Sequence, residues 1–229
     1  VVAGIVARDA SGTKRIRARL GVILATGGYD WKAEYVRAFD ALPEAGSMAP
    51  PTVSGDHIVM AAKAGAIAVP ARAPAQSPIF IGYKVPAETI YGRASYRMWL
   101  PGVPHCIAVN RYGNRFSNDG FYPDVATKVG RFDGQEQGQP NWPAWIVFDQ
   151  NMIDKYGLMP SWPGQPLSEG MAISADSIEV LARTVGIDPS GLERTIARFN
   201  AFCETGVDED FGRGTVPWGR IMTGDPRLP

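Results

Sequence analysis

The sequence predicts an α/β segment over about the first 80 residues and a larger α+β segment after it. An apolar run at residues 22–25 is followed by a glycine turn and a helical pattern, which is the unit that builds α/β sheets. Prolines then recur between residues 70 and 86 and interrupt any helix. Because aromatic residues become frequent beyond them, we predict a domain boundary near residue 80.

The composition is that of a globular protein, with 45% apolar and 20% charged residues among 229. Basic and acidic residues balance at 23 each, so no net charge attracts nucleic acid or an anionic membrane. The apolar runs are far shorter than the roughly 20 residues of a membrane-spanning helix, and no secretory signal is visible, so a cytoplasmic protein is the default expectation. Two cysteines and two histidines without ligand spacing predict no metal site.

The elements of the first segment follow from local patterns. A β-hairpin is predicted over residues 1–20, because an apolar arm precedes a turn signal at residues 9–12 and an alternating pattern follows it. Residues 22–25 are apolar throughout, which is typical of a parallel strand covered on both faces. Asp30 is placed to cap a helix over residues 31–39.

The second segment contains one clear strand and two clear helices. Residues 144–149 are predicted to form the strand, and residues 174–185 a helix with its apolar side chains inward. Asp188 and Pro189 supply a cap and a first-turn proline for the next helix, whose apolar stripe continues to Gly206.

Three stretches of sequence carry candidate binding residues. The first is the glycine turn at residues 25–29, where a strand ends; α/β sheets bind nucleotides at this position, and a missing Cβ lets a ligand touch the backbone. The GxGxxG fingerprint is absent, so an ordinary strand-to-helix turn is the alternative.

The other two stretches also have a purely structural alternative. Residues 54–56 precede a predicted helix at residues 57–64, and the free amides of a helix start favour an anion or an electron-rich ring edge; a simple capping motif would look the same. Residues 110–119 look by composition like a hairpin with a polar turn, and Phe121 and Tyr122 follow them.

Taken together, the order and spacing of these stretches resemble the flavoprotein family of fumarate reductases and 3-ketosteroid Δ1-dehydrogenases over nearly the whole chain. In that family an ATGG turn precedes a TGDG-type helix start and then an N-x-x-G-x-R-F-x-N-E motif. The matching stretches here are residues 25–29, 53–57 and 110–119. Residues 143–150 and the tail from residue 192 to 214 look most like the ketosteroid dehydrogenase branch.

This resemblance implies a fold and a cofactor. It implies that residues 1–80 are part of a Rossmann-like FAD-binding domain and that residues 81–229 form a truncated α+β capping domain for the substrate. The implied cofactor is FAD, and the implied contacts are Ala25, Thr26, Gly27, Gly28, Gly55 and Asp56. Because the pyrophosphate-binding glycine loop is not among these residues, we expect the chain alone to bind FAD weakly and to be inactive.

The resemblance also implies a reaction, the 1,2-desaturation of a 3-ketosteroid or a similar apolar cyclic ketone. Tyr122 falls where the family has a tyrosine that removes the proton from carbon 2, while a hydride leaves carbon 1. A free phenol has a pKa near 10, so the site must lower that pKa or acidify the substrate through its keto oxygen. The implied substrate contacts are Phe116, Asn118 and Phe121. The alternative for Tyr122 is a core aromatic residue.

Two other functions stay open from the sequence. A fumarate-reductase-like ene reductase would need an arginine or lysine for its dicarboxylate, but residues 120–124, which include the aromatic Phe121 and Tyr122, stand where that family has an arginine. A noncatalytic structural or interaction module is the other alternative. Separately, sheet edges that lack neighbouring strands invite self-association, so a homo-oligomer is a further expectation. His57 and Asp119 depart from the family's Gly and Glu. We expect Arg115 to pair with Asp119 or Asp124 and hold the loop, and a role in proton delivery is the alternative.

Overall fold

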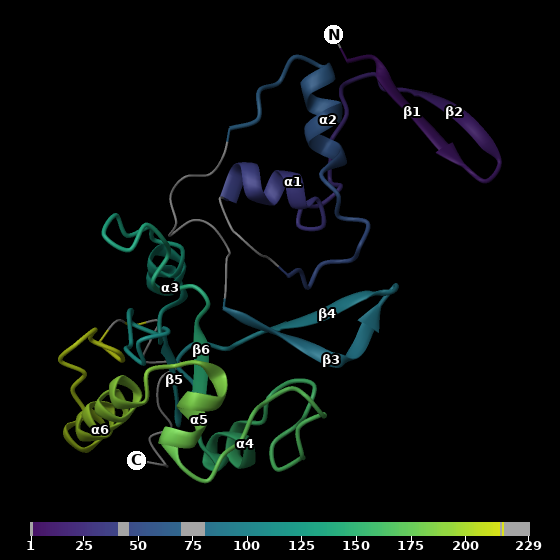
Figure 1. Ribbon diagram of the computed structural model, residues 1–229. Helices are drawn as coiled ribbons and strands as arrows, with labels where there is room; N and C mark the ends of the chain where they lie inside the picture. The colour runs from purple at the N-terminus through teal and green to yellow at the C-terminus, as the bar shows by residue number, and fades with distance from the viewer. Residues whose placement is uncertain (1, 41–45, 70–80, 216, 218–229) are drawn as a thin grey trace. The chain divides into compact units, whose positions relative to one another are not determined.

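The computed structural model describes residues 2–40, 46–69, 81–215 and 217. The chain forms two compact units, Val1–Pro70 and Ala71–Pro229. The boundary that we predicted near residue 80 lies outside the described residues. Figure 1 gives the order of the elements, and each unit is described below by itself.

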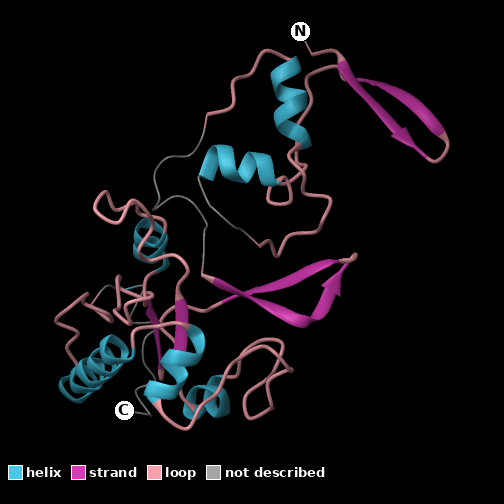
Figure 2. Cartoon of the chain, in the orientation of Figure 1, coloured by secondary structure: helices cyan, strands magenta, loops and turns pink. Residues whose placement is uncertain are grey.

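The first unit begins with a two-stranded antiparallel hairpin. Its strands are β1 (Gly4–Asp9) and β2 (Gly12–Arg17), in agreement with the predicted hairpin (Figure 2). The carboxylate of Asp9 closes the turn by accepting a hydrogen bond from the backbone N–H of Ser11 at 2.8 Å. Ile5 lies opposite Ile16 in the register, and both side chains stay largely exposed.

The parallel strand predicted at residues 22–25 is wrong. These residues have no strand structure, and the side chain of Ile23 is 94% exposed. A strand exists only where its backbone is hydrogen-bonded to a neighbouring strand. In the described part of the first unit, the two strands β1 and β2 pair with each other and leave residues 22–25 without such a neighbour.

The helices of the first unit are short. The predicted helix at residues 31–39 exists, but it begins later, as α1 (Ala33–Tyr35), and continues as the π-helical turn η1 (Val36–Asp40). The predicted cap is wrong, because the Asp30 carboxylate instead accepts a hydrogen bond from the hydroxyl of Ser47 at 3.1 Å. The next predicted helix is confirmed as α2 (Asp56–Lys63).

The second unit contains two separate antiparallel strand pairs. The hairpin of β3 (Gly82–Ile90) and β4 (Arg93–Met98) forms one pair. The other joins β5 (Cys106–Val109) to β6 (Trp145–Phe148), which confirms the strand predicted at residues 144–149.

The hairpin predicted at residues 110–119 is wrong, because its second strand does not form. The side-chain oxygen of Asn110 accepts hydrogen bonds from the backbone N–H groups of Tyr112 and Asn114, at 3.0 and 3.1 Å. This local turn uses the polar groups that a returning strand would need. β5 pairs with β6 instead.

In the part of the second unit that the structure describes, four helices have defined bounds, and their ends follow local capping rules. They are α3 (Tyr122–Val129), α4 (Gln150–Tyr156), α5 (Ile178–Val185) and α6 (Pro189–Thr205). α5 is shorter than predicted because Ser177 caps it and accepts a hydrogen bond from the N–H of Val180. α6 is confirmed, with Asp188 as its cap and Gly206 in the left-handed conformation at its end.

The core of the second unit lies on both faces of β5. Cys106 and Ala108 belong to one apolar cluster, with Trp99 and Phe116, whereas Ile107 and Val109 belong to another. Alternate residues of a strand point to opposite faces, so helices and loops cover this strand on both sides. Among the described residues, no helix combines the length and the apolar character needed to span a membrane.

Candidate functional site

The glycine turn of the first unit lies directly beside the start of α2. The backbone N–H of Gly55 donates a hydrogen bond to the carbonyl of Gly28 at 3.0 Å, and the N–H of Trp31 donates to the carbonyl of Val53 at 3.1 Å. Two stretches that the sequence singled out separately are therefore brought together.

Glycine is required at both sides of this contact. Gly27 and Gly55 each have a φ of 80°, in the left-handed region that other residues rarely adopt. A Cβ on Gly27 would lie 3.2 Å from a methyl group of Val53, and a Cβ on Gly55 would lie 2.8 Å from the ring of Tyr35. Larger residues would separate the turn from the helix.

An aromatic cluster supports the glycine turn. The ring of Tyr29 packs edge-on against Tyr35 and Phe39, with centroid distances of 6.3 and 5.4 Å. Its hydroxyl donates a hydrogen bond to the Asp40 carboxylate at 3.2 Å. Burial and the neighbouring Asp40 charge raise the pKa of Tyr29, and burial also raises that of Asp40, although the hydrogen bond from Tyr29 acts the other way. Tyr29 is thus a neutral support at neutral pH.

The surface of this turn fits the polar parts of a nucleotide cofactor. Residues 25–28 are exposed, and their backbone N–H groups donate no hydrogen bond to any residue that the structure describes. Nδ1 of His57, near the start of α2, is buried and lacks a hydrogen-bond partner among the described residues. Free amides, absent side chains and an unsatisfied ring nitrogen are groups that a flavin nucleotide can engage.

The predicted substrate residues occupy one segment of the second unit. Tyr122 is the first residue of α3 and, like Phe121, is partly buried; the centroids of the two rings are 6.3 Å apart. Phe116 is 8% exposed and packs in the core. Asn118 is also buried, where it accepts a hydrogen bond from the N–H of Gly120 and donates one to another loop.

A buried charge cluster lies behind this segment. We use that name for four side chains that are each at most 7% exposed: Arg115, Asp119, Asp208 and Arg213. The guanidinium of Arg115 lies 3.0 Å from the Asp119 carboxylate and 2.8 Å from that of Asp208. Arg213 lies 3.3 Å from Asp119. The two positive and two negative charges compensate one another in the interior.

The pairing expected for Arg115 is therefore confirmed for Asp119 and wrong for Asp124. Asp124 accepts a hydrogen bond from the backbone N–H of Asn118 at 2.7 Å and pairs with Lys128 at 2.8 Å. Burial acts to raise the pKa of Asp208, but hydrogen bonds from Arg115 and from backbone N–H groups outweigh it and lower that pKa.

Sequence reasoning missed Asp208 and Arg213 as members of this cluster. Asp208 lies 93 positions after Arg115, and no local pattern joins them. The signal that could have found them is the density of charged residues in the tail at residues 208–213, next to glycine and phenylalanine.

A cavity of about 1680 Å³ lies in the second unit, between the β5–β6 pair and the helices α4, α5 and α6, and Asp208 and Arg213 of the buried charge cluster also line it. His105 lies on its wall, with Nδ1 3.4 Å from the Asp149 carboxylate. Neither Tyr122 nor the three predicted substrate contacts line this cavity, so we do not assign it to the substrate. The described residues contain no cluster of His, Cys, Asp or Glu that could hold a metal ion.

Comparison with known families supports a flavin site. A family model described as an FAD binding domain matches residues 1–225. The chain belongs to this family. This match confirms the predicted flavoprotein family and the predicted cofactor, FAD. The fold is that of an FAD-binding flavoenzyme with mixed helices and strands.

The most informative relatives are dehydrogenases of oxo compounds. The chain is 33% identical to the 4-oxocyclohexanecarboxylate 2-dehydrogenase of Sinomonas cyclohexanicum, over 90% of this chain and 36% of the relative. It is 33% identical to the 3-oxosteroid 1-dehydrogenase of Mycobacterium tuberculosis, over 99% and 41%. A fumarate reductase (cytochrome) of Shewanella frigidimarina is 29% identical, over 86% and 31%.

A solved structure supports the same relationship. The crystal structure of the 3-ketosteroid Δ1-dehydrogenase of Sterolibacterium denitrificans, in complex with 1,4-androstadiene-3,17-dione, has a TM-score of 0.76 and 27% identity, and it covers 99% of this chain. The chain spans about two fifths of the length of these dehydrogenases.

Proposed function

We propose that this chain is part of an FAD-dependent dehydrogenase that desaturates an apolar cyclic ketone next to its carbonyl group, as in the 1,2-desaturation of a 3-ketosteroid. The observation that carries the proposal is the pair of partly buried rings at the start of α3, Phe121 and Tyr122. The relatives give independent support, because the names of both dehydrogenases at 33% identity specify an oxo group on a ring system.

In this proposal the two segments have different tasks. Residues 1–80 belong to a Rossmann-like FAD-binding domain, and residues 81–229 belong to an α+β capping domain that carries the substrate residues. The division of the chain into compact units on either side of Pro70 supports such an organisation.

The glycine turn and the start of α2 hold the cofactor. Residues 25–28 are exposed, and their backbone N–H groups, which bond to no described residue, can donate to the flavin nucleotide. Gly55 keeps the helix start close to the turn, and Asp56 offers an exposed carboxylate for hydroxyl groups of the nucleotide. When bound, FAD supplies the acceptor for the hydride that leaves carbon 1 of the ketone.

Tyr122, acting as the phenolate, receives the proton from carbon 2 of the ketone and becomes a neutral phenol. The electron pair of the broken C2–H bond forms the new double bond as the hydride departs from carbon 1, so charge and atoms balance. Phe121 gives the ring system an apolar face, and Phe116 and Asn118 shape the segment from within. Enclosure of the ketone by aromatic side chains excludes water from the reacting carbons.

The test is a Tyr122→Phe substitution in the full-length enzyme, with product identified by mass spectrometry. We expect turnover of a 3-ketosteroid to fall by about 100-fold or more, the usual contribution of a positioned base, while FAD content stays unchanged. The matched control is Tyr112→Phe, because Tyr112 lies in the same segment but uses its hydroxyl to bind Glu136 at the surface. Unchanged turnover in Tyr122→Phe would remove this residue from the reaction.

The same preparation tests the alternative reaction. If the reduced enzyme converts fumarate and leaves cyclic ketones untouched, the fumarate-reductase-like function is correct. A protein that binds no FAD at full length would instead be a noncatalytic module.

A further inference from the structure

We propose that Asp208 is a positioning residue that fixes Tyr122 through the buried charge cluster. This inference rests on the function proposed above, because it concerns the placement of the base in that reaction. Asp208 lies in the loop after α6, whereas Tyr122 begins α3, so the link between them runs through side chains.

The Asp208 carboxylate organises its own loop. Its two oxygens accept hydrogen bonds from the backbone N–H groups of Asp210, Phe211 and Arg213, at 3.1, 3.3 and 3.1 Å. A single buried side chain thereby holds three backbone N–H groups within residues 210–213, on both sides of Gly212, and so fixes the carbonyl of Gly212.

The same carboxylate joins this loop to the segment that carries Tyr122. Arg115 donates two hydrogen bonds to Asp208, at 3.1 and 2.8 Å, and lies between the rings of Phe199 and Phe211, with its guanidinium carbon 4.8 and 5.2 Å from their centroids. Arg115 also donates to Asp119, which accepts a hydrogen bond from the N–H of Ala108 in β5. The loop is thus fixed to the central strand.

Asn118 completes the path to Tyr122. Its amide donates a hydrogen bond to the carbonyl of Gly212 at 3.3 Å, and its backbone N–H donates to the carboxylate of Asp124 at 2.7 Å. Its backbone carbonyl accepts from the N–H of Phe121 at 3.0 Å. Asn118 therefore holds the residues on both sides of Tyr122, and its own position depends on the loop that Asp208 organises.

The energetic balance of the buried charge cluster indicates that it positions residues more than it stabilises the fold. Burying two ion pairs costs desolvation that their attraction roughly repays, so apolar side chains of similar size would stabilise the fold at least as well. What the paired charges add is one defined geometry, since a bidentate contact fixes both distance and orientation. A displacement of about 1 Å at a reacting group can cost about 100-fold in rate.

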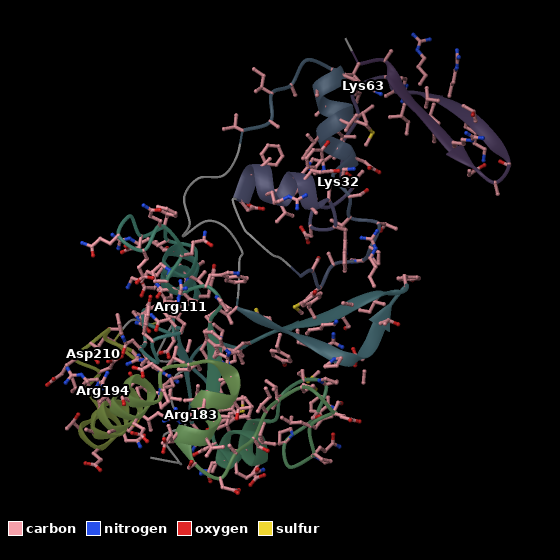
Figure 3. The ribbon with its side chains drawn as sticks, in the orientation of Figure 1. Lys32, Lys63, Arg111, Arg183, Arg194 and Asp210 are labelled. Atoms are coloured by element: carbon pink, nitrogen blue, oxygen red, sulfur yellow. The ribbon has the colours of Figure 1, made fainter. Side chains whose placement is uncertain are left out.

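The test compares Asp208→Asn with Asp210→Asn in the full-length holoenzyme. Asp210, which is labelled in Figure 3, lies in the same loop but pairs with exposed Arg198 at 2.8 Å. The readouts are FAD content, KM for a 3-ketosteroid, and the rate of flavin bleaching by that ketone without oxygen. We expect Asp208→Asn to slow bleaching by about 10- to 100-fold with FAD content retained and KM within about threefold, and Asp210→Asn to match the wild type.

A second variant covers the case in which Asp208→Asn does not fold. Arg115→Met combined with Asp208→Asn removes one charge of each sign, so the remaining Asp119 and Arg213 stay paired, and the same slow bleaching is expected. A folded variant of either kind that bleaches at the wild-type rate overturns the inference. Tyr122→Phe separates the two proposals: if it is slow while Asp208→Asn is normal, only the positioning role fails, and if it is fast, the role of Tyr122 in the proposed function fails.

Discussion

Replacing Asp119 by Asn should destabilise the second unit by about 3 kcal/mol or more. The Asp119 side chain is fully buried, and its carboxylate accepts hydrogen bonds from Arg115, Arg213 and the backbone of Ala108. The substitution leaves two buried arginine charges with one buried carboxylate: Asp208 still pairs with Arg115, whereas Arg213 keeps its hydrogen bonds to the carbonyls of Val103 and Cys106 but loses its ionic partner. Removing one partner of a buried ion pair typically costs about 3–5 kcal/mol, and we expect the lower end because Arg115 keeps its bidentate contact.

Urea unfolding followed by tryptophan fluorescence measures this change, since Trp99 lies in the core of the same unit. If the free energy of unfolding falls by about 2 kcal/mol per M of urea, the midpoint of the unfolding transition should move to a urea concentration about 1.5 M lower. The matched control is Asp154→Asn, an exposed carboxylate that accepts one hydrogen bond from Gln150, and it should change the free energy of unfolding by less than about 0.5 kcal/mol. A loss below about 1 kcal/mol for Asp119→Asn would refute the description of the cluster as buried and mutually compensated.

Three further predictions concern other parts of the molecule. Gly55→Ala should weaken FAD binding of the full-length protein by about tenfold in a fluorescence titration. The new Cβ would clash with the Tyr35 ring, and alanine rarely adopts the left-handed backbone conformation of this position. In native protein, a thiol reagent at pH 8 should modify exposed Cys203 and spare Cys106, whose pKa burial raises to about 12, whereas both react in urea. Because the pKa of Asp208 is lowered in the folded state, its ionised form adds to the free energy of unfolding; this contribution is complete above about pH 4 and is lost as the pH falls further. Between pH 5 and 3, the free energy of unfolding should therefore depend less steeply on pH in Asp208→Asn than in the wild type.

Each of these predictions has a clear contrary result. Gly65→Ala is the control for Gly55→Ala, since Gly65 is also left-handed but has open space around its Cβ position; equal FAD affinity losses would contradict the role of the turn contact. Modification of Cys106 in native protein would contradict its burial. An identical pH dependence in Asp208→Asn and wild type would contradict the ionised, hydrogen-bonded state of Asp208.

Helices and hairpins whose ends are set by residues nearby in the sequence were predictable. The β1–β2 hairpin carries its own turn residue, Asp9, and α6 carries its own cap, Asp188, whereas α2 begins after Gly55 without a side-chain cap and was predicted from its apolar and alanine-rich pattern. The strand predicted at residues 22–25 failed because strands depend on partners elsewhere, and apolar side chains do not reveal whether a partner is present. The Asp30 cap failed because Ser47 competes for that carboxylate.

The residues of the candidate site also fall into those that the sequence could predict and those that it could not. The family motif pointed to Gly27 and Gly55, and the structure brings their segments into contact through backbone hydrogen bonds. Only one of the two buried partners of Arg115 could be predicted from the sequence. Asp119 is four residues away and within reach of local reasoning, whereas Asp208 is brought there by the packing of α6. Long-range pairs of this kind follow from tertiary structure and leave no spacing signal.

The central claim is that Tyr122 takes the proton from carbon 2 while the hydride leaves carbon 1. The most direct measurement is anaerobic bleaching of flavin absorbance in the full-length enzyme, with ordinary 3-ketosteroid and with the same compound deuterated at carbon 1 or carbon 2. Wild-type enzyme should show slower bleaching with deuterium at carbon 1, and Tyr122→Phe should bleach about 100-fold more slowly at equal flavin content. Bleaching of Tyr122→Phe at the wild-type rate would contradict the account.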